Sequence, residues 1–430
     1  MIIELFKQLT KIPRCSGTHE PFITFIKSFA NKYNYICKVD NANNILCYKS
    51  NEISNICLQS HYDIVCLEDG KIPQIIQDGD ILKAKDSTLG ADNGIGCAYM
   101  LALMSENKSC EFLFTCDEEI GLIGANNISL DIKSTNMLNL DSEAMGEICI
   151  GCAGGLDIFA TTSKATIKEN KKDKDLYEII VSGFDGGHSG VDINKDIPNA
   201  IKVLCEFLIL CDDVEILDIN GGERINSIPK YAKAIIACNK KPINISSNIT
   251  INPVDDKSEH FRVLDKNILS FIINMQNGVL KYDEELDVVI DSINLAIVET
   301  TMNDVKISLS ARSMENKNLN EIAITNINML RQKGFEVNVE GKYPAWSPDT
   351  NEFTNEVLEV YKNYFSDAKL YAIHAGLECA IFKEKYPHLN IASIGPDIHF
   401  PHSNKEQCSI SSVNKVYEIL KEIINKKEEK

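Results

Sequence analysis

The sequence predicts an α/β protein, in which a mostly parallel sheet flanked by helices is interrupted by an inserted α+β domain. In the first 150 or so residues, short apolar runs alternate with helical stretches. The composition changes near 151–155, and the helix–strand alternation returns from about Tyr343. Since 430 residues exceed what one hydrophobic core usually supports, we expect a discontinuous domain of residues 1–154 and 343–430, with residues 155–342 inserted.

The first domain is expected to begin with two amphipathic helices, because apolar residues recur at helical spacing in residues 4–9 and 21–33. Short apolar runs then predict buried strands at 45–48, 56–60, 112–116 and 137–140. Helices are predicted at about 93–106 and 121–128. This order favours a parallel sheet with helical connections.

The inserted segment, residues 155–342, is expected to contain both strands and helices. We expect strands at 176–182, 232–238, 305–310 and 335–339, and helices at 198–211, 258–276 and 319–333. The charged run 168–175 predicts a solvated turn between strands. In the returning part we expect a helix at 352–365 and strands at 368–371 and 390–394.

The composition indicates which partners and which cellular compartment to expect. The 44 Lys+Arg against 62 Asp+Glu give 44 − 62 = −18, which argues against nucleic acid and anionic membranes as partners. No apolar run approaches the roughly 18 residues of a membrane span. The 15 cysteines are scattered without a CxxC pair, and no secretory segment follows Met1. We therefore expect a cytoplasmic protein with reduced thiols.

Acidic residues and histidines cluster after the predicted strands and at a glycine turn. The clusters are His61-Tyr62-Asp63, Ala91-Asp92-Asn93-Gly94, Asp117-Glu118-Glu119, Asp141-Ser142-Glu143 and, in the returning part, Pro401-His402-Ser403. The carboxyl ends of parallel strands meet at one edge of a sheet. Each motif alone is more often a surface pair or a turn, but several buried carboxylates would repel one another unless a cation joined them. Together they predict a metal site.

These motifs, in this order, resemble those of the M20 di-zinc metallopeptidases, and most of all the bacterial aminoacyl-histidine dipeptidases. The resemblance extends over the whole chain. Its other motifs are Gly151-Cys152-Ala153-Gly154-Gly155, Gly186-Gly187-His188-Ser189-Gly190, Asn226-Ser227-Ile228-Pro229, Ala311-Arg312-Ser313, Tyr343-Pro344-Ala345-Trp346 and His374-Ala375-Gly376-Leu377-Glu378-Cys379. One departure is Cys66, where relatives tend to have proline.

The resemblance implies two Zn²⁺ per chain. Asp92 would bridge them, with His61 and Asp141 completing one site and Glu119 and His402 the other. Glu118 would be the general base, and Asp63, two residues after His61 on one strand face, would orient that imidazole. Mn²⁺ or Co²⁺ would suit the same ligands.

The resemblance also assigns residues of the inserted domain. His188 would reach the scissile carbonyl, in some relatives from the partner subunit of a homodimer formed through this domain. Asn226 and Arg312 would bind substrate, the guanidinium capturing a C-terminal carboxylate, although a surface ion pair is the alternative for Arg312. His374 would contact substrate or serve the structure.

The expected activity is hydrolysis of dipeptides, especially Xaa-His. One alternative is another M20 amidohydrolase, such as an N-acyl amino acid deacylase or a tripeptidase. Another is a cysteine hydrolase using Cys15 or Cys116, and a third is a non-catalytic metal-binding scaffold.

Overall fold

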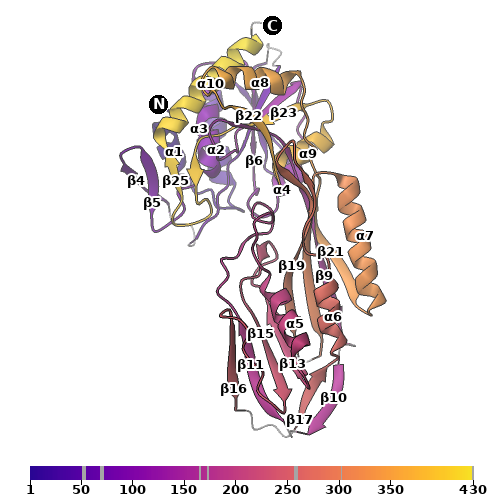
Figure 1. Ribbon diagram of the computed structural model, residues 1–430. Helices are drawn as coiled ribbons and strands as arrows, with labels where there is room; N and C mark the ends of the chain where they lie inside the picture. Colours follow the sequence, from indigo (N-terminus) through magenta and orange to yellow (C-terminus); the bar gives the residue numbers. More distant parts are fainter. Residues whose placement is uncertain are drawn as a thin grey trace. The chain divides into compact units, whose positions relative to one another are not determined.

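The computed structural model describes residues 1–50, 55–67, 72–163, 166–171, 174–255, 260–301 and 303–428 (Figure 1). The chain divides into two compact units. The first, which we call the sheet unit, comprises Met1–Cys152, Trp346–Ala372 and Leu377–Lys430. The second, which we call the inserted unit, comprises Ala153–Ala345 and Ile373–Gly376.

An eight-stranded sheet forms the centre of the sheet unit. Its strand order is β1-β2-β6-β3-β7-β23-β8-β22, with bounds β1 Ile36–Val39, β2 Ile45–Tyr48, β3 Ile56–His61, β6 Glu111–Thr115, β7 Asn136–Asn139, β8 Glu147–Cys152, β22 Lys369–Ile373 and β23 Asn390–Ser393. The central strands β6, β3, β7 and β23 run parallel, whereas β1, β2 and β8 pair antiparallel with their neighbours. The predicted α/β class is confirmed.

Helices bury the central strands on both faces, which explains their unbroken apolar runs. Every residue of β3 and β6 is buried. The helices are α1 Ile2–Leu9, α2 Glu20–Lys32, α3 Ala91–Ser105, α4 Ile123–Asn126, α8 Glu352–Lys362, α9 Glu378–Lys385 and α10 Ile410–Glu428. Helix α3 is buried along nearly its whole length, because α1 packs on it and β3 lies beneath it.

A small four-stranded sheet, β24-β25-β5-β4, also belongs to the sheet unit. Its strands are β4 Gln74–Asp78, β5 Ile81–Lys85, β24 Ile398–His399 and β25 Gln407–Ser409. Strands β24 and β25 pair antiparallel, so they hold both ends of the loop that carries His402.

The inserted unit is built on an eleven-stranded sheet whose main path is β16-β11-β15-β13-β19-β20-β9-β21. Its strands are β9 Gly154–Thr162, β10 Thr166–Lys171, β11 Asp175–Val181, β13 Glu215–Gly221, β15 Ala232–Cys238, β16 Ile249–Val254, β17 His260–Leu264, β18 Gly278–Asp283, β19 Val288–Thr300, β20 Val305–Ser313 and β21 Glu336–Tyr343. A separate pair joins β12 Gly187–His188 to β14 Ser227–Ile228.

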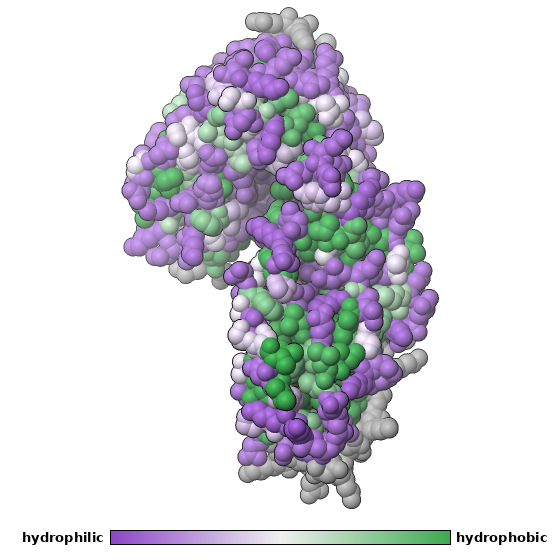
Figure 2. Space-filling view, viewed as in Figure 1, coloured by the Kyte–Doolittle hydropathy of each residue, from purple (hydrophilic) through white to green (hydrophobic). Residues whose placement is uncertain are grey.

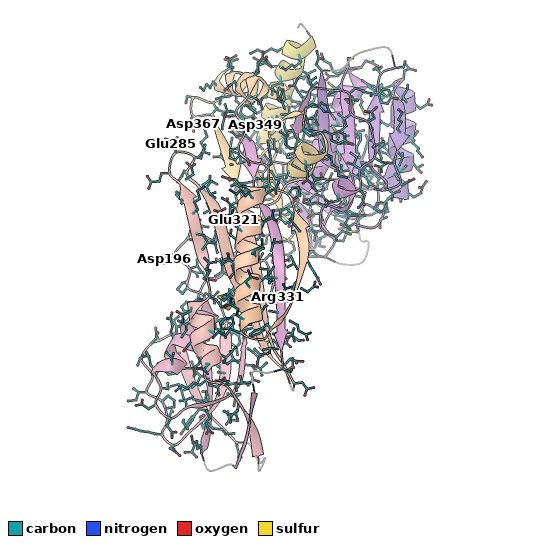
Figure 3. The ribbon with its side chains drawn as sticks, turned by 90° about the vertical axis from the view of Figure 1, so that its right-hand side faces the viewer. Asp196, Glu285, Glu321, Arg331, Asp349 and Asp367 are labelled. Carbon is teal, nitrogen blue, oxygen red and sulfur yellow. A yellow bond between two sulfur atoms is a disulfide. The ribbon has the colours of Figure 1, made fainter. Side chains whose placement is uncertain are left out.

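In the described part of the inserted unit, helices pack against this sheet: α5 Ala200–Leu210, α6 Asn267–Asn274 and α7 Asn316–Gln332. Helix α7 is amphipathic. Its buried residues include Leu319, Ile322 and Leu330, whereas Glu321 and Arg331 lie on its exposed side (Figure 3). Figure 2 shows apolar side chains gathered on the face of the inserted unit in view.

Two predicted elements of the inserted unit are wrong. The stretch 258–276 is not one helix, because His260–Leu264 forms strand β17 and the helix α6 starts only at Asn267. The charged run 168–175 is not simply a turn, because β10 extends to Lys171 and pairs with β17. In both cases strand pairing across the sheet overrides a local pattern. Residues 172–173 and 256–259 lie outside the described part of the chain.

Among the described residues, no helix is long and apolar enough to cross a membrane.

Candidate metal centre

The first predicted ligand, His61, is the last residue of β3, at the carboxyl end of the parallel strands. Its side chain is buried. Nδ1 lies 3.1 Å from the main-chain oxygen of Asp63 and 3.6 Å from the Asp63 carboxylate. These contacts on Nδ1 leave Nε2 facing the other acidic side chains, which is how a metal-binding imidazole is usually oriented.

Asp63 is fully buried and also holds the next loop. Its carboxylate accepts hydrogen bonds from the main-chain N–H of Glu118 at 3.1 Å and of Glu119 at 3.3 Å. Burial opposes the charge, but the hydrogen bonds from His61 and Ser16 hold the pKa of Asp63 below its usual value. Asp63 therefore stays ionised and ties His61 to the loop after β6.

Asp92 lies in the first turn of α3, after Gly90, whose φ of 68° favours glycine. A Cβ on Gly90 would lie 2.8 Å from the Arg14 guanidinium. Glu406 accepts hydrogen bonds from the main-chain N–H groups of Leu89, Gly90 and Ala91 at 2.7 to 2.9 Å. Glu406 thus fixes the turn that presents Asp92, a role that the sequence did not reveal because main-chain amides leave no motif.

Glu118 and Glu119 follow β6, and Asp141 follows β7. Asp117, the residue before Glu118, has a left-handed φ of 51°. This conformation turns the chain after β6. Asn93 donates to the main-chain oxygen of Leu140 at 2.9 Å and contacts the Asp141 carboxylate. The loops after β6 and β7 and the start of α3 are therefore tied together.

The five predicted ligands converge. His61 Nε2 lies 3.1 Å from Asp92 Oδ1 and 3.2 Å from Asp141 Oδ1. His402 Nε2 lies 3.0 Å from Asp92 Oδ2 and 2.9 Å from Glu119 Oε2. Each imidazole therefore lies between two carboxylates, and the two oxygens of Asp92 face different imidazoles.

Glu118 borders the same cluster, within 4.8 Å of ligand atoms of His61 and Glu119. Burial raises the pKa of Glu118 well above its usual value, and the charges of Asp141 and Glu119 add to the effect. Burial likewise raises the pKa of Glu119 and of Asp141. The crowded carboxylates in turn raise the pKa of His402 to about 11, chiefly through hydrogen bonds to Asp92 and Glu119.

This donor set fits two divalent cations. Carboxylates and imidazoles are ordinary ligands of zinc. Glu119 Oε1 is buried and has no hydrogen-bond partner among the described residues, and an unpartnered buried carboxylate oxygen is costly unless a cation binds it. The two oxygens of Asp92, which face different imidazoles, and the unpartnered oxygen of Glu119 are suited to hold two cations.

A buried polar layer lies behind the metal centre and was not predicted. Glu378 Oε2 accepts hydrogen bonds from Gln59 Nε2 at 2.6 Å and Thr115 Oγ1 at 2.7 Å. Asn139 donates to Gln59 Oε1 at 2.6 Å. Burial raises the pKa of Glu378 to about 8. The signal in the sequence was its position in the motif that begins with His374.

Four of the predicted site residues are in the inserted unit, and three of them lie close together. The β19–β20 register pairs Arg312 with Ser292, and Ser292 Oγ lies 2.7 Å from His374 Nε2. A Cβ on Gly190 would lie 2.3 Å from the main-chain oxygen of His374 and 3.1 Å from the His188 ring. His188, Arg312 and His374 therefore form one cluster, which we call the arginine cluster.

The imidazoles of the arginine cluster are neutral. Burial and the nearby charge of Arg312 lower the pKa of His188 to about 4 and that of His374 to about 3. His188 Nδ1 accepts hydrogen bonds from the N–H groups of Gly190 and Val191 at 3.1 and 3.3 Å. Its hydrogen must therefore be on Nε2, where it can be donated.

Arg312 is not in a surface ion pair. It is 8% exposed and donates to the Tyr343 hydroxyl at 2.7 Å, and its Nε has no hydrogen-bond partner within the described part of the chain. The main-chain oxygen of Asn226 accepts a hydrogen bond from the Ser189 N–H at 2.9 Å, and the Asn226 side chain is exposed.

Neither cysteine of the alternative hydrolase is a suitable nucleophile. Cys15 forms a disulfide with Cys66, which our expectation of reduced thiols did not include. Cys116 is buried, and burial raises its pKa to about 12, so the reactive thiolate is disfavoured.

The fold and this donor set define a metallopeptidase class. Residues 57–426 match the sequence profile of peptidase family M20/M25/M40, and the chain belongs to that family. It is 31% identical over 467 residues to the cytosol non-specific dipeptidase of Escherichia coli (strain K12), covering 98% of this chain and 96% of that protein.

Solved structures agree with this placement. An aminoacylhistidine dipeptidase from Vibrio alginolyticus matches with a TM-score of 0.84 and 28% identity, over 99% of this chain and 96% of that one. A tripeptidase from Staphylococcus aureus matches with a TM-score of 0.60 and 17% identity, over 100% of this chain and 98% of that one. This second match shows a shared fold alone.

Proposed function

We propose that this protein is a two-metal dipeptidase that hydrolyses short peptides, including Xaa-His dipeptides such as β-alanyl-histidine. The observation that carries the proposal is the arrangement of two imidazoles, each between two carboxylates, with Asp92 offering one oxygen to each. Zinc is the proposed metal, with Mn²⁺ or Co²⁺ as substitutes for the same ligands.

The proposed ligands are His61 and Asp141 on one ion, Glu119 and His402 on the other, and Asp92 on both. Two zinc ions bound there would polarise the peptide carbonyl and lower the pKa of a water toward about 7. Glu118 takes the proton of the attacking water and passes it to the leaving amine, and its position within 4.8 Å of ligand atoms of His61 and Glu119 supports that role. Asp63 orients His61 and the Glu118 loop.

The arginine cluster is the proposed site for the other parts of the substrate. Arg312 binds the C-terminal carboxylate, and the unpartnered Nε supports that role because a guanidinium can make two parallel hydrogen bonds to a carboxylate. His188 donates its Nε2 hydrogen to the scissile carbonyl oxygen. His374, whose Nε2 lies 2.7 Å from Ser292 Oγ, contacts the substrate or supports the site, and the exposed Asn226 assists binding.

We assign the protein to the cytoplasm, in line with the name of its Escherichia coli relative.

We also propose a homodimer formed through the inserted unit. Leu210, Ile243 and Ile245 are exposed apolar residues there and line a cavity of about 260 Å³, and exposed apolar patches commonly mark interfaces.

A substrate panel tests the proposed activity. Purified protein with zinc is offered β-alanyl-histidine, non-histidine dipeptides, tripeptides and N-acetyl amino acids, with Glu118→Gln as the inactive control. We expect hydrolysis of the dipeptides and its loss with a chelator. Preference for tripeptides or N-acetyl amino acids indicates another M20 amidohydrolase. Metal binding without turnover of any compound indicates a metal-binding scaffold.

A further inference from the structure

The disulfide Cys15–Cys66 joins two segments that are 51 residues apart in sequence, with Cα atoms 5.6 Å apart. One is the stretch Arg14–His19, which we call the clamp segment and which precedes α2. The other is the chain that leaves β3 just after the metal-centre residues His61 and Asp63. The described chain between α1 and α2 has no regular secondary structure, apart from a single bridge between Cys15 and Ile64.

The clamp segment contacts the loop that carries the proposed general base. Ser16 Oγ donates a hydrogen bond to Asp63 Oδ2 at 2.8 Å, and Asp63 in turn holds the N–H groups of Glu118 and Glu119. The Gly17 N–H donates to Asp117 Oδ1 at 2.6 Å. The clamp segment therefore supports the loop after β6 at two adjacent points.

Two further contacts extend this support. His19 Nε2 lies 3.1 Å from Asp117 Oδ2. Arg14 is buried and donates to the main-chain oxygen of Tyr62 at 3.0 Å and of Gly90 at 2.6 Å. A Cβ on Gly94 would lie 2.5 Å from the same guanidinium. The clamp segment thus contacts the chain beside His61, the turn beside Asp92 and the loop beside Glu119.

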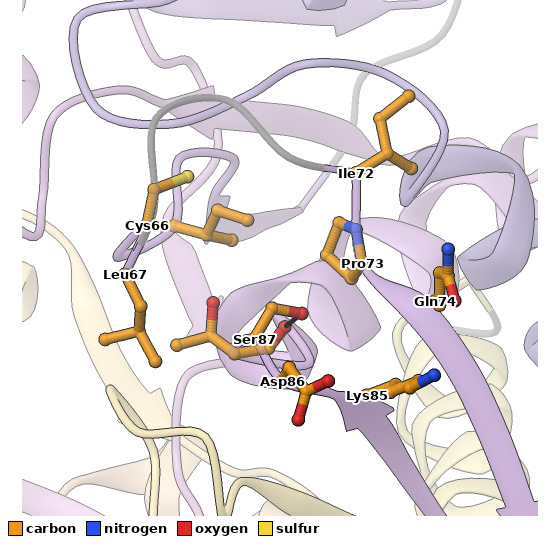
Figure 4. Close-up of a pocket in the computed structure, with 10 residues that line it drawn as sticks. Cys66, Leu67, Ile72, Pro73, Gln74, Lys85, Asp86 and Ser87 are labelled. Atoms are coloured by element: carbon orange, nitrogen blue, oxygen red, sulfur yellow. Dashed lines mark hydrogen bonds between the residues drawn. The ribbon is translucent and has the colours of Figure 1, made fainter.

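The disulfide is reachable from solvent. Cys66 lines an open cavity of about 480 Å³, together with residues such as Leu67, Lys85 and Asp86 (Figure 4). A dithiol reductant can attack one sulfur there, form a mixed disulfide and then close its own ring. In that exchange the protein gains two electrons and two protons and ends with two thiols, while the dithiol is oxidised to a cyclic disulfide.

We propose that the Cys15–Cys66 disulfide is a redox-sensitive tie that holds the clamp segment against the ligand loops, so that the oxidised enzyme retains its metal more firmly than the reduced one. Ser16 and Arg14 act as positioning residues through Asp63 and the Gly90 turn.

Without the covalent bond, an irregular segment gains conformational freedom. Loss of groups that hold metal ligands in place typically costs 10 to 100-fold in metal affinity. A disulfide in a cytoplasmic enzyme usually has such a reversible role. This inference rests on the proposed two-metal function.

The test compares metal loss from the two redox states of the holoenzyme. Zinc transfer to a chromogenic chelator is timed before and after reduction with a water-soluble phosphine, which is not a thiol ligand for zinc. The phosphine becomes its oxide with oxygen from water and leaves two thiols. We expect about tenfold faster metal loss after reduction, with faster hydrogen exchange in residues 14–19 and 117–119. Dipeptide turnover is recorded in parallel.

Matched variants distinguish the effect of reducing this disulfide from effects of the other cysteines. The double variant Cys15→Ser/Cys66→Ser should lose metal as fast as the reduced wild type and ignore the phosphine. Cys211→Ser, at a partly exposed free cysteine, should respond as the wild type does. Ser16→Ala should speed metal loss in the oxidised state.

Several outcomes overturn the inference. They are equal metal loss in both redox states, a response that persists in the double variant, or alkylation and mass spectrometry showing Cys15 and Cys66 free in the air-oxidised protein. If the double variant fails to fold, the wild-type comparison still decides. A redox difference in metal loss without any dipeptide turnover would support the tie and contradict the proposed function.

Discussion

Histidines stand in opposite electrostatic settings in the two units. In the sheet unit, His61 and His402 each lie between two carboxylates, which raise their pKa. In the inserted unit, burial and Arg312 lower the pKa of His188 and His374. The first setting favours binding of cations, and the second favours binding of an anionic group by neutral imidazoles beside a guanidinium. The neighbours of each histidine therefore shift its pKa in opposite directions in the two units.

The largest expected effect concerns the acidic setting. We predict that Glu118→Gln lowers kcat for a dipeptide by about 10² to 10⁴-fold, because it removes a positioned proton acceptor. Metal content should stay as in the wild type, whereas Asp92→Asn should lose metal. Unchanged turnover in Glu118→Gln would show that Glu118 is not the general base. Glu321→Gln, on the exposed side of α7, serves as the control.

The arginine cluster should affect catalysis through His188. His188→Asn should lower kcat by about 10² to 10³-fold, because it removes the Nε2 hydrogen-bond donor. KM should change little if the donor acts mainly on the transition state. His388→Asn, at an exposed histidine, should leave the steady-state kinetics unchanged. An increase in KM alone would make His188 a substrate-binding residue instead.

Arg312 tests whether the inserted unit recognises an anion. Arg312→Met should raise KM for a dipeptide by roughly 10 to 100-fold, since hydrogen bonds to charged groups are worth about 1.5 to 3 kcal/mol. A dipeptide amide should be affected much less, because it lacks the carboxylate. Arg331→Met, at the exposed end of α7, is the matched control. Equal effects on acid and amide would argue against carboxylate recognition.

The smallest expected effect is on stability against pH. The pKa of buried His374 falls from 6.5 to about 3 on folding, so below about pH 6.5 the unfolded chain binds a proton that the folded chain does not. Stability should therefore fall with decreasing pH, by about 2 kcal/mol from this residue between pH 7 and pH 5. Urea unfolding at the two pH values measures this loss. His374→Gln should show a correspondingly smaller loss, and an identical pH dependence would rule out His374 as its source.

The two settings also differ in how far the sequence predicts them. The clusters that hold the five proposed metal ligands and Glu118 predicted a metal site, because parallel strands bring their carboxyl ends together, and the resemblance to the family implied the role of each residue. The partners that hold them were not, because Glu406 binds main-chain amides and Ser16 reaches Asp63 from a segment without a motif. Their roles depend on three-dimensional contacts that local patterns do not record.

In the inserted unit, the sequence pattern predicted the secondary structure less well than in the sheet unit. Strand β17 was predicted to be part of a helix, and the 13-residue strand β19, which carries Ser292, was not predicted. Long antiparallel strands draw their stability from cross-strand neighbours, which the sequence of one strand does not reveal. The pairing Cys15–Cys66 was missed for a similar reason, because scattered cysteines do not disclose which two come together.

The central claim is that the acidic setting of the sheet unit binds two metal ions that the reaction needs. The most direct measurement is a titration of metal-free protein with zinc, in which bound metal per chain and dipeptide hydrolysis are followed together. We predict that activity reaches its maximum at two equivalents per chain and that Asp92→Asn shifts this stoichiometry. Full activity with one equivalent, or with none, would contradict the two-metal centre.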